Sequence, residues 1–114
     1  MQLVDKNITL AELEKMSTKM FNKIVKAVVD IEQNVMVVDA DMHADQEDVL
    51  LENGSQQGNL WGINLHPSEY GTAGWVEFDS MINLRPSWGN VTRGVDDPMI
   101  REKIIRIVNR LVTK

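Results

Sequence analysis

The sequence predicts an α+β fold, in which a mainly antiparallel sheet of four to six strands carries an N-terminal and a C-terminal helix packed on one face. Apolar residues recur every three or four positions at both ends of the chain, which is typical of amphipathic helices. Between the ends, apolar and polar residues alternate with period two, as in half-buried strands. The length of 114 residues suits one core, so residues 1–114 are expected to form a single globular domain.

The N-terminal helix is expected over residues 10–22. Thr9 and Glu12 have the spacing of a capping box, in which a hydroxyl and a carboxylate accept hydrogen bonds from free amides at a helix start. The apolar residues that follow have helical spacing and predict a stripe that faces the core: Leu10, Leu13, Met16, Met20 and Phe21.

A β-hairpin is expected over residues 24–42. Both of its halves alternate with period two, and Gln33 with Asn34 would form a two-residue turn between them. In that register Lys26 lies opposite Asp41 as a cross-strand pair of opposite charge. One face of the hairpin becomes apolar, and the other becomes polar and acidic.

Residues 44–53 fit two structures. Asp45 could cap a short helix that ends near Gly54, or the segment could be a strand that turns into the next one; we favour the strand. Residues 60–65 alternate cleanly and are expected to form that next strand. Residues 67–74 are rich in Pro, Gly and Ser, which indicates a loop.

The longest alternating stretch, residues 75–85, is expected to be one central strand with Trp75 on its polar face. A turn-rich segment follows. Asp96 or Asp97 should then cap the last helix, because Pro98 suits a first helical position, where no amide is needed. The apolar stripe of this helix is expected to be buried: Ile100, Ile104, Ile107, Val108 and Leu111.

Composition excludes several classes of protein. The chain has no cysteine, so it has no disulfide bonds, cysteine zinc site or thiol nucleophile. It has no apolar stretch near the roughly 18 residues of a membrane span, and its first residues do not resemble a signal peptide. We therefore expect a cytoplasmic protein without a membrane partner.

Charge is segregated along the chain. Lys and Arg are absent between Lys26 and Arg85, a segment that contains eleven acidic residues. Basic residues return on one side of the last helix, at Lys103, Arg106, Arg110 and Lys114. These four could contact phosphates, but a net charge of −5 opposes a general affinity for nucleic acid, and a solvated helix face is the favoured interpretation.

Three groups of residues are candidates for a site. Spacing by two would align Asp39, Asp41, His43 and Asp45 along a strand, as carboxylate and imidazole ligands of a divalent metal. Polar faces of later strands could bring together an acid–base set: His43, His66, Asp79 and Arg85. The third group lies in a small-residue loop suited to an anion or a partner: Trp88, Asn90 and Arg93. Each group also has a purely structural explanation, as a solvated strand face or a well-tied loop.

Five short segments carry a resemblance to a known family: His43-Ala44-Asp45, Leu50-Leu51-Glu52-Asn53-Gly54-Ser55, Leu60-Trp61-Gly62-Ile63-Asn64-Leu65, Glu77-Phe78-Asp79-Ser80 and Ile82-Asn83-Leu84-Arg85-Pro86. Through them the chain resembles a small family of prokaryotic single-domain proteins described as a domain of unknown function. The resemblance implies no activity, cofactor or catalytic residue.

Two functional hypotheses follow. The favoured one is a non-enzymatic binding or interaction domain that uses the acidic sheet face and the loop with Trp88 and Arg93, with a homo-oligomer as an open alternative. The other is a small metal-dependent or acid–base hydrolase that uses the set around His43 and His66. They separate on geometry, because catalysis requires its groups to converge in one cleft.

Overall fold

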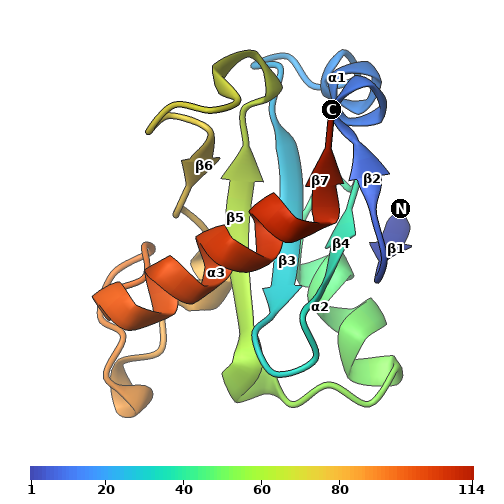
Figure 1. The fold of residues 1–114 in the computed structure, drawn as a ribbon. Coiled ribbons are helices and arrows are strands. Elements are labelled where there is room, and N and C mark those ends of the chain that lie inside the picture. The colour runs from blue at the N-terminus through green and yellow to red at the C-terminus, as the bar shows by residue number, and fades with distance from the viewer.

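β3 and β5 form the centre of a five-stranded antiparallel sheet (Figure 1). The computed structural model describes residues 1–114. The sheet has the order β1-β4-β3-β5-β6, and β2 pairs with β7 in parallel. The strands are β1 (Gln2–Val4), β2 (Ile8–Thr9), β3 (Val25–Asp30), β4 (Val35–Val38), β5 (Leu60–Leu65), β6 (Val76–Glu77) and β7 (Val112–Thr113), and the helices are α1 (Leu10–Ser17), α2 (His43–Glu52) and α3 (Pro98–Leu111). The predicted α+β class and strand number are confirmed.

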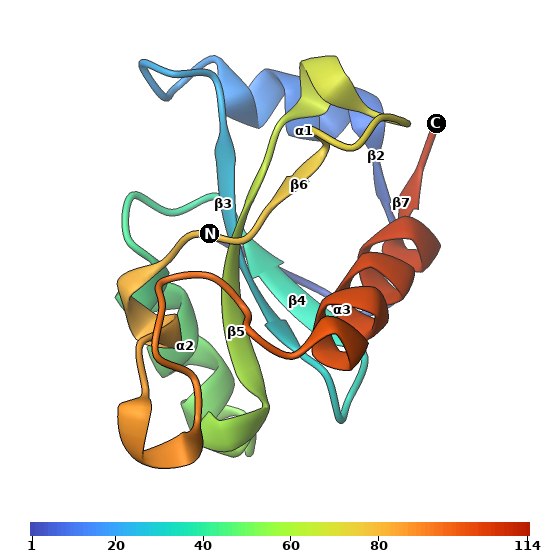
Figure 2. The same ribbon diagram turned by 90° about the vertical axis from the view of Figure 1, so that its left-hand side faces the viewer.

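Different helices lie against the two faces of the sheet (Figure 2). α3 crosses one face, where its apolar stripe joins the main core; α1 lies across one end of the sheet, and its Leu13 joins the same core. α2 covers the other face, where Leu50 packs with Val28, Val37 and Leu60. The prediction of an open, polar and acidic second face is therefore wrong, because this face carries an apolar cluster of its own. None of the helices is both long and apolar enough to cross a bilayer.

The β3–β4 hairpin has the predicted apolar face but another register. Asp30 pairs with Val35, which leaves a four-residue turn instead of the expected two-residue turn. The buried Asp30 carboxylate accepts hydrogen bonds from two turn amides, at Glu32 and Gln33, and so stabilises the longer loop. Asn34 has the expected positive φ, at 60°. The shift by two residues keeps the same side chains in the core, but Lys26 and Asp41 do not pair.

Residues 43–52 form the helix α2, so the favoured strand over residues 44–53 is wrong. The helix buries His43, Gln46 and Leu50, which are three or four residues apart. Gln46 is fully buried and donates a hydrogen bond to the carbonyl of Lys26 at 2.7 Å. Because two of the three buried residues are polar, the segment lacks the hydrophobic periodicity that would have revealed a helix.

The expected central strand over residues 75–85 is also wrong. β6 is a two-residue edge strand, and the chain then leaves the sheet in a turn capped by Ser80. Asn83 takes the place of a strand neighbour: its side chain accepts from the amide of Gly62 at 2.8 Å and donates to its carbonyl at 2.9 Å. Trp75 is buried in the main core and donates to Asn109, so its expected place on the polar face is wrong.

The predicted helix starts are confirmed at both ends of the chain. Thr9 and Glu12 form the capping box of α1, and Asp97 caps α3 with Pro98 in its first turn. α1 is shorter than expected, because its helical structure ends at Ser17 and Phe21 is fully exposed. Side-chain hydroxyls near the end of α1 hydrogen-bond to carbonyls of the preceding turn, a pattern that competes with helix continuation.

Candidate functional site

A pocket of about 340 Å³ opens between the first turn of α2, β3, β5 and the turn after β6. We call it the His43 pocket. Its polar lining comes from four different elements, and the residues that matter below are Lys26, His43, Asn64, Asp79 and Arg93. His43 and Asp79 of the predicted acid–base set are therefore brought to one cavity.

His43 is held in a defined protonation state. It is the first residue of α2 and is 8% exposed, and its Nε2 lies 2.7 Å from the carbonyl oxygen of Ile63. A carbonyl only accepts, so Nε2 carries the proton and Nδ1 is left as an acceptor without a protein partner. Loss of solvation lowers the pKa of His43, the hydrogen bond to Ile63 opposes this, and the charge of Lys26 adds to it. The imidazole is therefore neutral at pH 7.

Groups that favour an anion lie at the start of α2, although its first turn also carries the exposed Asp45. Met42, the residue before the helix, provides no side-chain cap, so amides of the first turn stay free at the positive end of the helix dipole. The side chain of Lys26 has no carboxylate within ion-pair distance, while Arg93 pairs with Asp79 at 2.8 Å. The pocket thus combines one unpaired ammonium group, a helix N-terminus and an ion pair.

A hydrogen-bonded chain leads from the pocket to His66. Asn64 is 7% exposed and donates to the carboxylate of Glu77 at 3.0 Å, whereas its Oδ1 is buried without a partner. Nε2 of His66 lies 3.1 Å from the same carboxylate oxygen. The hydrogen bonds from Asn64 and His66 lower the pKa of Glu77. His66 does not line the His43 pocket and is connected to it only through this chain.

Arg85 lies in a second pocket, of about 290 Å³, which we call the Trp88 pocket. This cavity adjoins the start of α3 and includes Trp61, Trp88 and Ile100 in its lining. The predicted catalytic set is therefore divided, since Arg85 does not line the His43 pocket.

Arg85 is the most enclosed cation at this second pocket. Its side chain is 9% exposed, and its guanidinium lies against the rings of Trp61, at 4.8 Å, and Trp88, at 5.6 Å. Nε and Nη2 donate to the carbonyls of Ile82 and Leu60, but Nη1 has no partner, and neither does the indole nitrogen of Trp61. Burial lowers the pKa of Arg85, and the Glu47 carboxylate at 3.9 Å opposes this.

The loop that was expected to bind as one unit is divided between the two pockets. The Trp88 ring is 61% exposed at one of them, and Arg93 lines the other. Asn90 is buried, and its amide nitrogen donates to three loop carbonyls, so its visible role is to hold the loop together. Arg93 pairs with Asp79 rather than with the acids that follow it.

The proposed metal ligands are not aligned as the spacing suggested. β4 ends at Val38, Asp39 has a positive φ of 69°, and His43 begins a helix, so the two-residue spacing does not describe an extended strand. No three His, Asp or Glu side chains converge in a way that could hold a metal ion. Asp41 and Asp45 are exposed, whereas His43 turns inward to Ile63.

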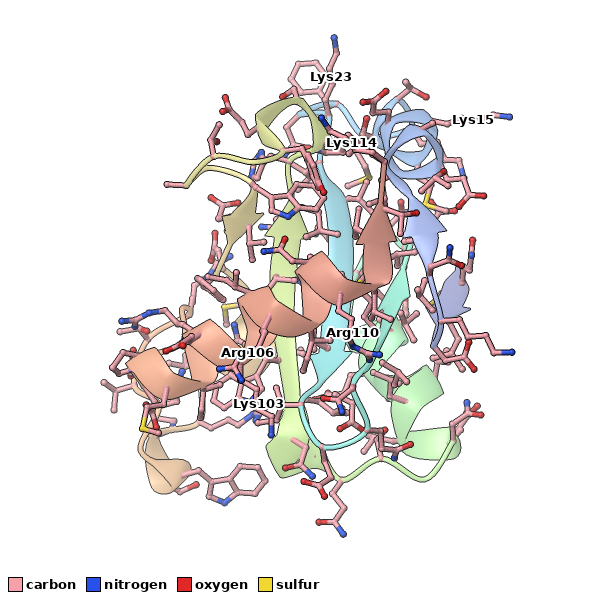
Figure 3. The ribbon with its side chains drawn as sticks, viewed as in Figure 1. Lys15, Lys23, Lys103, Arg106, Arg110 and Lys114 are labelled. Atoms are coloured by element: carbon pink, nitrogen blue, oxygen red, sulfur yellow. The ribbon has the colours of Figure 1, made fainter.

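Lys103, Arg106 and Arg110 lie along the outer side of α3, whereas Lys114, which was expected on the same helix, lies beyond its end, after β7 (Figure 3). Among them only Arg106 has a carboxylate within 4 Å, that of Glu102 at 3.5 Å on the same helix. Arg110 donates to the carbonyl of Asn34.

The fold and both pockets belong to a chain that a family model matches over residues 2–111; its description is protein of unknown function (DUF5674). The chain belongs to this family. The expected resemblance to a domain of unknown function is thus confirmed, with no activity attached to it. No curated protein and no solved structure matches the chain.

Three polar residues of the His43 pocket were expected as site candidates from the sequence, namely His43, Asp79 and Arg93, whereas Lys26 was expected in a cross-strand pair. The available signal was its position as the last base before the acidic segment. The contact between Arg85 and Trp61 could not be expected from local patterns, because the two residues lie far apart in the sequence.

Proposed function

We propose that the chain is a non-enzymatic binding domain that holds a phosphate group, free or carried by a small molecule, in the His43 pocket. One observation carries the proposal: the uncapped first turn of α2 and the unpaired ammonium of Lys26 line the same cavity. Free helix amides and a nearby cation are the elements of an anion site. The pair of Arg93 with Asp79 adds a guanidinium at the rim without changing the net charge.

The acceptors in the pocket favour phosphate over a simple carboxylate. Nδ1 of His43 and Oδ1 of Asn64 are both acceptors without partners. A singly protonated phosphate offers negative oxygens to the helix amides and Lys26, and one P–OH donor to an acceptor. An acetate ion supplies the charge but no donor.

The test is a titration with inorganic phosphate, followed by the ¹H–¹⁵N spectrum and by calorimetry. We expect shifts at the amides of His43 and Ala44, and a smaller effect of acetate. Lys26→Gln should weaken phosphate binding about tenfold, the usual value of one charge-assisted contact. Lys23→Gln is the matched control, since Lys23 is exposed and does not line the pocket. Equal effects of the two variants, or no shift in α2, would contradict the proposal.

The acid–base hydrolase stays as a second candidate because of one observation. A neutral His43 with a free Nδ1 beside an anion-binding turn has the form of a general base. The separation of Arg85 and His66 from the pocket weighs against the full set first considered. Hydrolysis of a chromogenic phosphate ester that His43→Gln abolishes would favour the enzyme, and binding without turnover would favour the binding domain.

A further inference from the structure

A row of basic side chains runs along the outer side of α3 and starts at the Trp88 pocket. Ile100 lines that pocket, and Lys103 follows it by one helical turn. Arg106 and Arg110 continue at intervals of three and four residues, the spacing that places side chains along one side of a helix, and Lys114 follows beyond the end of α3. All four basic residues are exposed (Figure 3). A line of basic side chains therefore begins next to an aromatic pocket.

We propose that this surface binds single-stranded nucleic acid, with an unpaired base on Trp88 and the phosphate backbone along the basic row. Proteins that bind single strands combine stacking aromatic rings with a positive surface that follows the backbone. Trp88 is the only tryptophan of this chain whose ring is largely exposed, since Trp61 and Trp75 are 6% and 4% exposed. A stacked base must be unpaired and splayed out, so a single strand fits better than a duplex.

The floor of the Trp88 pocket offers suitable donors for a base. Nη1 of Arg85 and Nε1 of Trp61 are both buried N–H groups without an acceptor. Carbonyl oxygens and ring nitrogens of a base would accept from them. Both groups are covered in this structure, so a base reaches them only after the pocket opens.

The second end of the row also carries an aromatic ring. The ammonium of Lys114 lies 5.8 Å from the centre of the Tyr70 ring. Tyr70 is half-buried and packs edge-on against Trp75 at 5.1 Å. The basic row thus has an aromatic residue at both ends.

Net charge does not exclude this partner. A net charge of −5 is a sum over the whole molecule, whereas α2, which carries four of the acidic residues, lies on the opposite face of the sheet from α3 (Figure 2). The molecule is at least 26 Å across, and charges are screened within roughly 8 Å at physiological ionic strength. Other acids are close: Asp96 and Asp97 line the Trp88 pocket, Glu47 lies 3.9 Å from Arg85, and Glu102 pairs with Arg106. The proposal therefore places the base at this pocket and the phosphates beyond it, beside Lys103 and Arg110.

An acidic protein segment is the competing class of partner. It would pair with the same bases, but it has no reason to engage an exposed indole beside a buried guanidinium. A single strand offers phosphates for the basic row and unpaired bases for the Trp88 ring, so the observations favour nucleic acid.

The test is fluorescence anisotropy at low salt with a short labelled oligouridylate, compared with a polyglutamate peptide of similar length. We expect saturable binding of the oligonucleotide, a logarithmic affinity that falls linearly with the logarithm of salt concentration, and little binding of the peptide. Trp88→Ala should weaken binding roughly tenfold, and Trp88→Phe should restore most of it, because base stacking needs only an aromatic ring.

Two triple variants with the same change of net charge distinguish binding at this surface from a nonspecific effect of net charge. Lys103→Gln, Arg106→Gln and Arg110→Gln together should lower the salt slope by about 2, since each neutralised phosphate of a single strand contributes about 0.7. The control replaces Lys6, Lys15 and Lys23 by Gln, an equal change of charge outside the row, and should leave the slope unchanged. Circular dichroism verifies that both variants fold.

Three results would overturn the proposal: no oligonucleotide binding at low salt, equal losses in both triple variants, or tighter binding of polyglutamate than of the oligonucleotide. The phosphate site is distinguished by Lys26→Gln, which lines the other pocket and should not change oligonucleotide affinity.

Discussion

Gly62 is the position at which the packing around the His43 pocket can be tested most directly. A Cβ atom at Gly62 would lie 2.5 Å from Cβ of Ser80, 2.6 Å from its Oγ, and 3.2 Å from Cδ2 of His43. Carbon atoms in contact are normally about 3.5–4.0 Å apart, so the overlap exceeds 1 Å. Overpacking of this kind costs about 1–3 kcal/mol, and the lower entropy of the unfolded alanine variant offsets about 0.5 kcal/mol. We expect Gly62→Ala to lower the free energy of unfolding by about 2 kcal/mol.

The assay is urea unfolding followed by circular dichroism, and the matched control is Gly58→Ala. A Cβ atom at Gly58 would meet only the Trp88 ring, at 3.7 Å, which is an ordinary contact. This control should change stability by less than about 0.5 kcal/mol. Gly62→Ala should also shift the NMR signals of the His43 ring, because the ring must move away. If Gly62→Ala unfolds at the same urea concentration as the native chain, Ser80 and His43 do not pack on β5 as described.

Three further predictions address protonation, exposure and the sheet faces. The pKa of His43 is lowered in the folded chain, so the unfolded chain binds more protons at acidic pH. The free energy of unfolding should therefore fall as the pH drops below about 6.5, by at most about 1.4 kcal/mol per pH unit. The variant His43→Gln should reduce this slope. Acrylamide should quench Trp88 far more than the other two tryptophans, so Trp88→Phe should remove most of the quenchable fluorescence. Val38→Asp should unfold the domain, since Val38 is fully buried. Asp39→Asn should stay folded, because Asn tolerates the positive φ at this position. Similar losses of stability in both variants would mean that the buried and exposed faces of the sheet are assigned wrongly.

Most of the core could be predicted from the sequence, because it depends on short-range patterns. The helix starts at Thr9 and Asp97 follow from local capping chemistry. The strand β5 follows from the alternation of apolar and polar residues over residues 60–65. The apolar face of the hairpin was predicted correctly despite a wrong turn length, since a shift by two residues keeps the period of a strand. These features need no information about distant parts of the chain.

The candidate site could be predicted only in part, because it depends on long-range contacts of polar side chains. α2 buries His43 and Gln46 against backbone carbonyls of β5 and β3, and such polar burial leaves no hydrophobic pattern. Arg85 lies against the rings of Trp61 and Trp88. Trp61 is 24 residues away in the sequence, and the alternation of polar and apolar residues carries no information about contacts at that separation. Residue types indicated candidate side chains, but not which of them share a cavity.

Both pockets exist because the strand expected over residues 75–85 stops after two residues. Beyond Glu77 the backbone leaves β5, and the Asn83 side chain supplies the hydrogen bonds that a strand would have made to Gly62. The departing chain then places Ser80 and Asp79 beside the start of α2, and it carries Arg85 to the Trp61 ring. A continuous strand would have paired along β5 and presented alternate side chains to fixed faces. The strongest local pattern of the sequence therefore fails where polar side chains replace backbone pairing, and the two candidate binding sites lie on either side of that replacement.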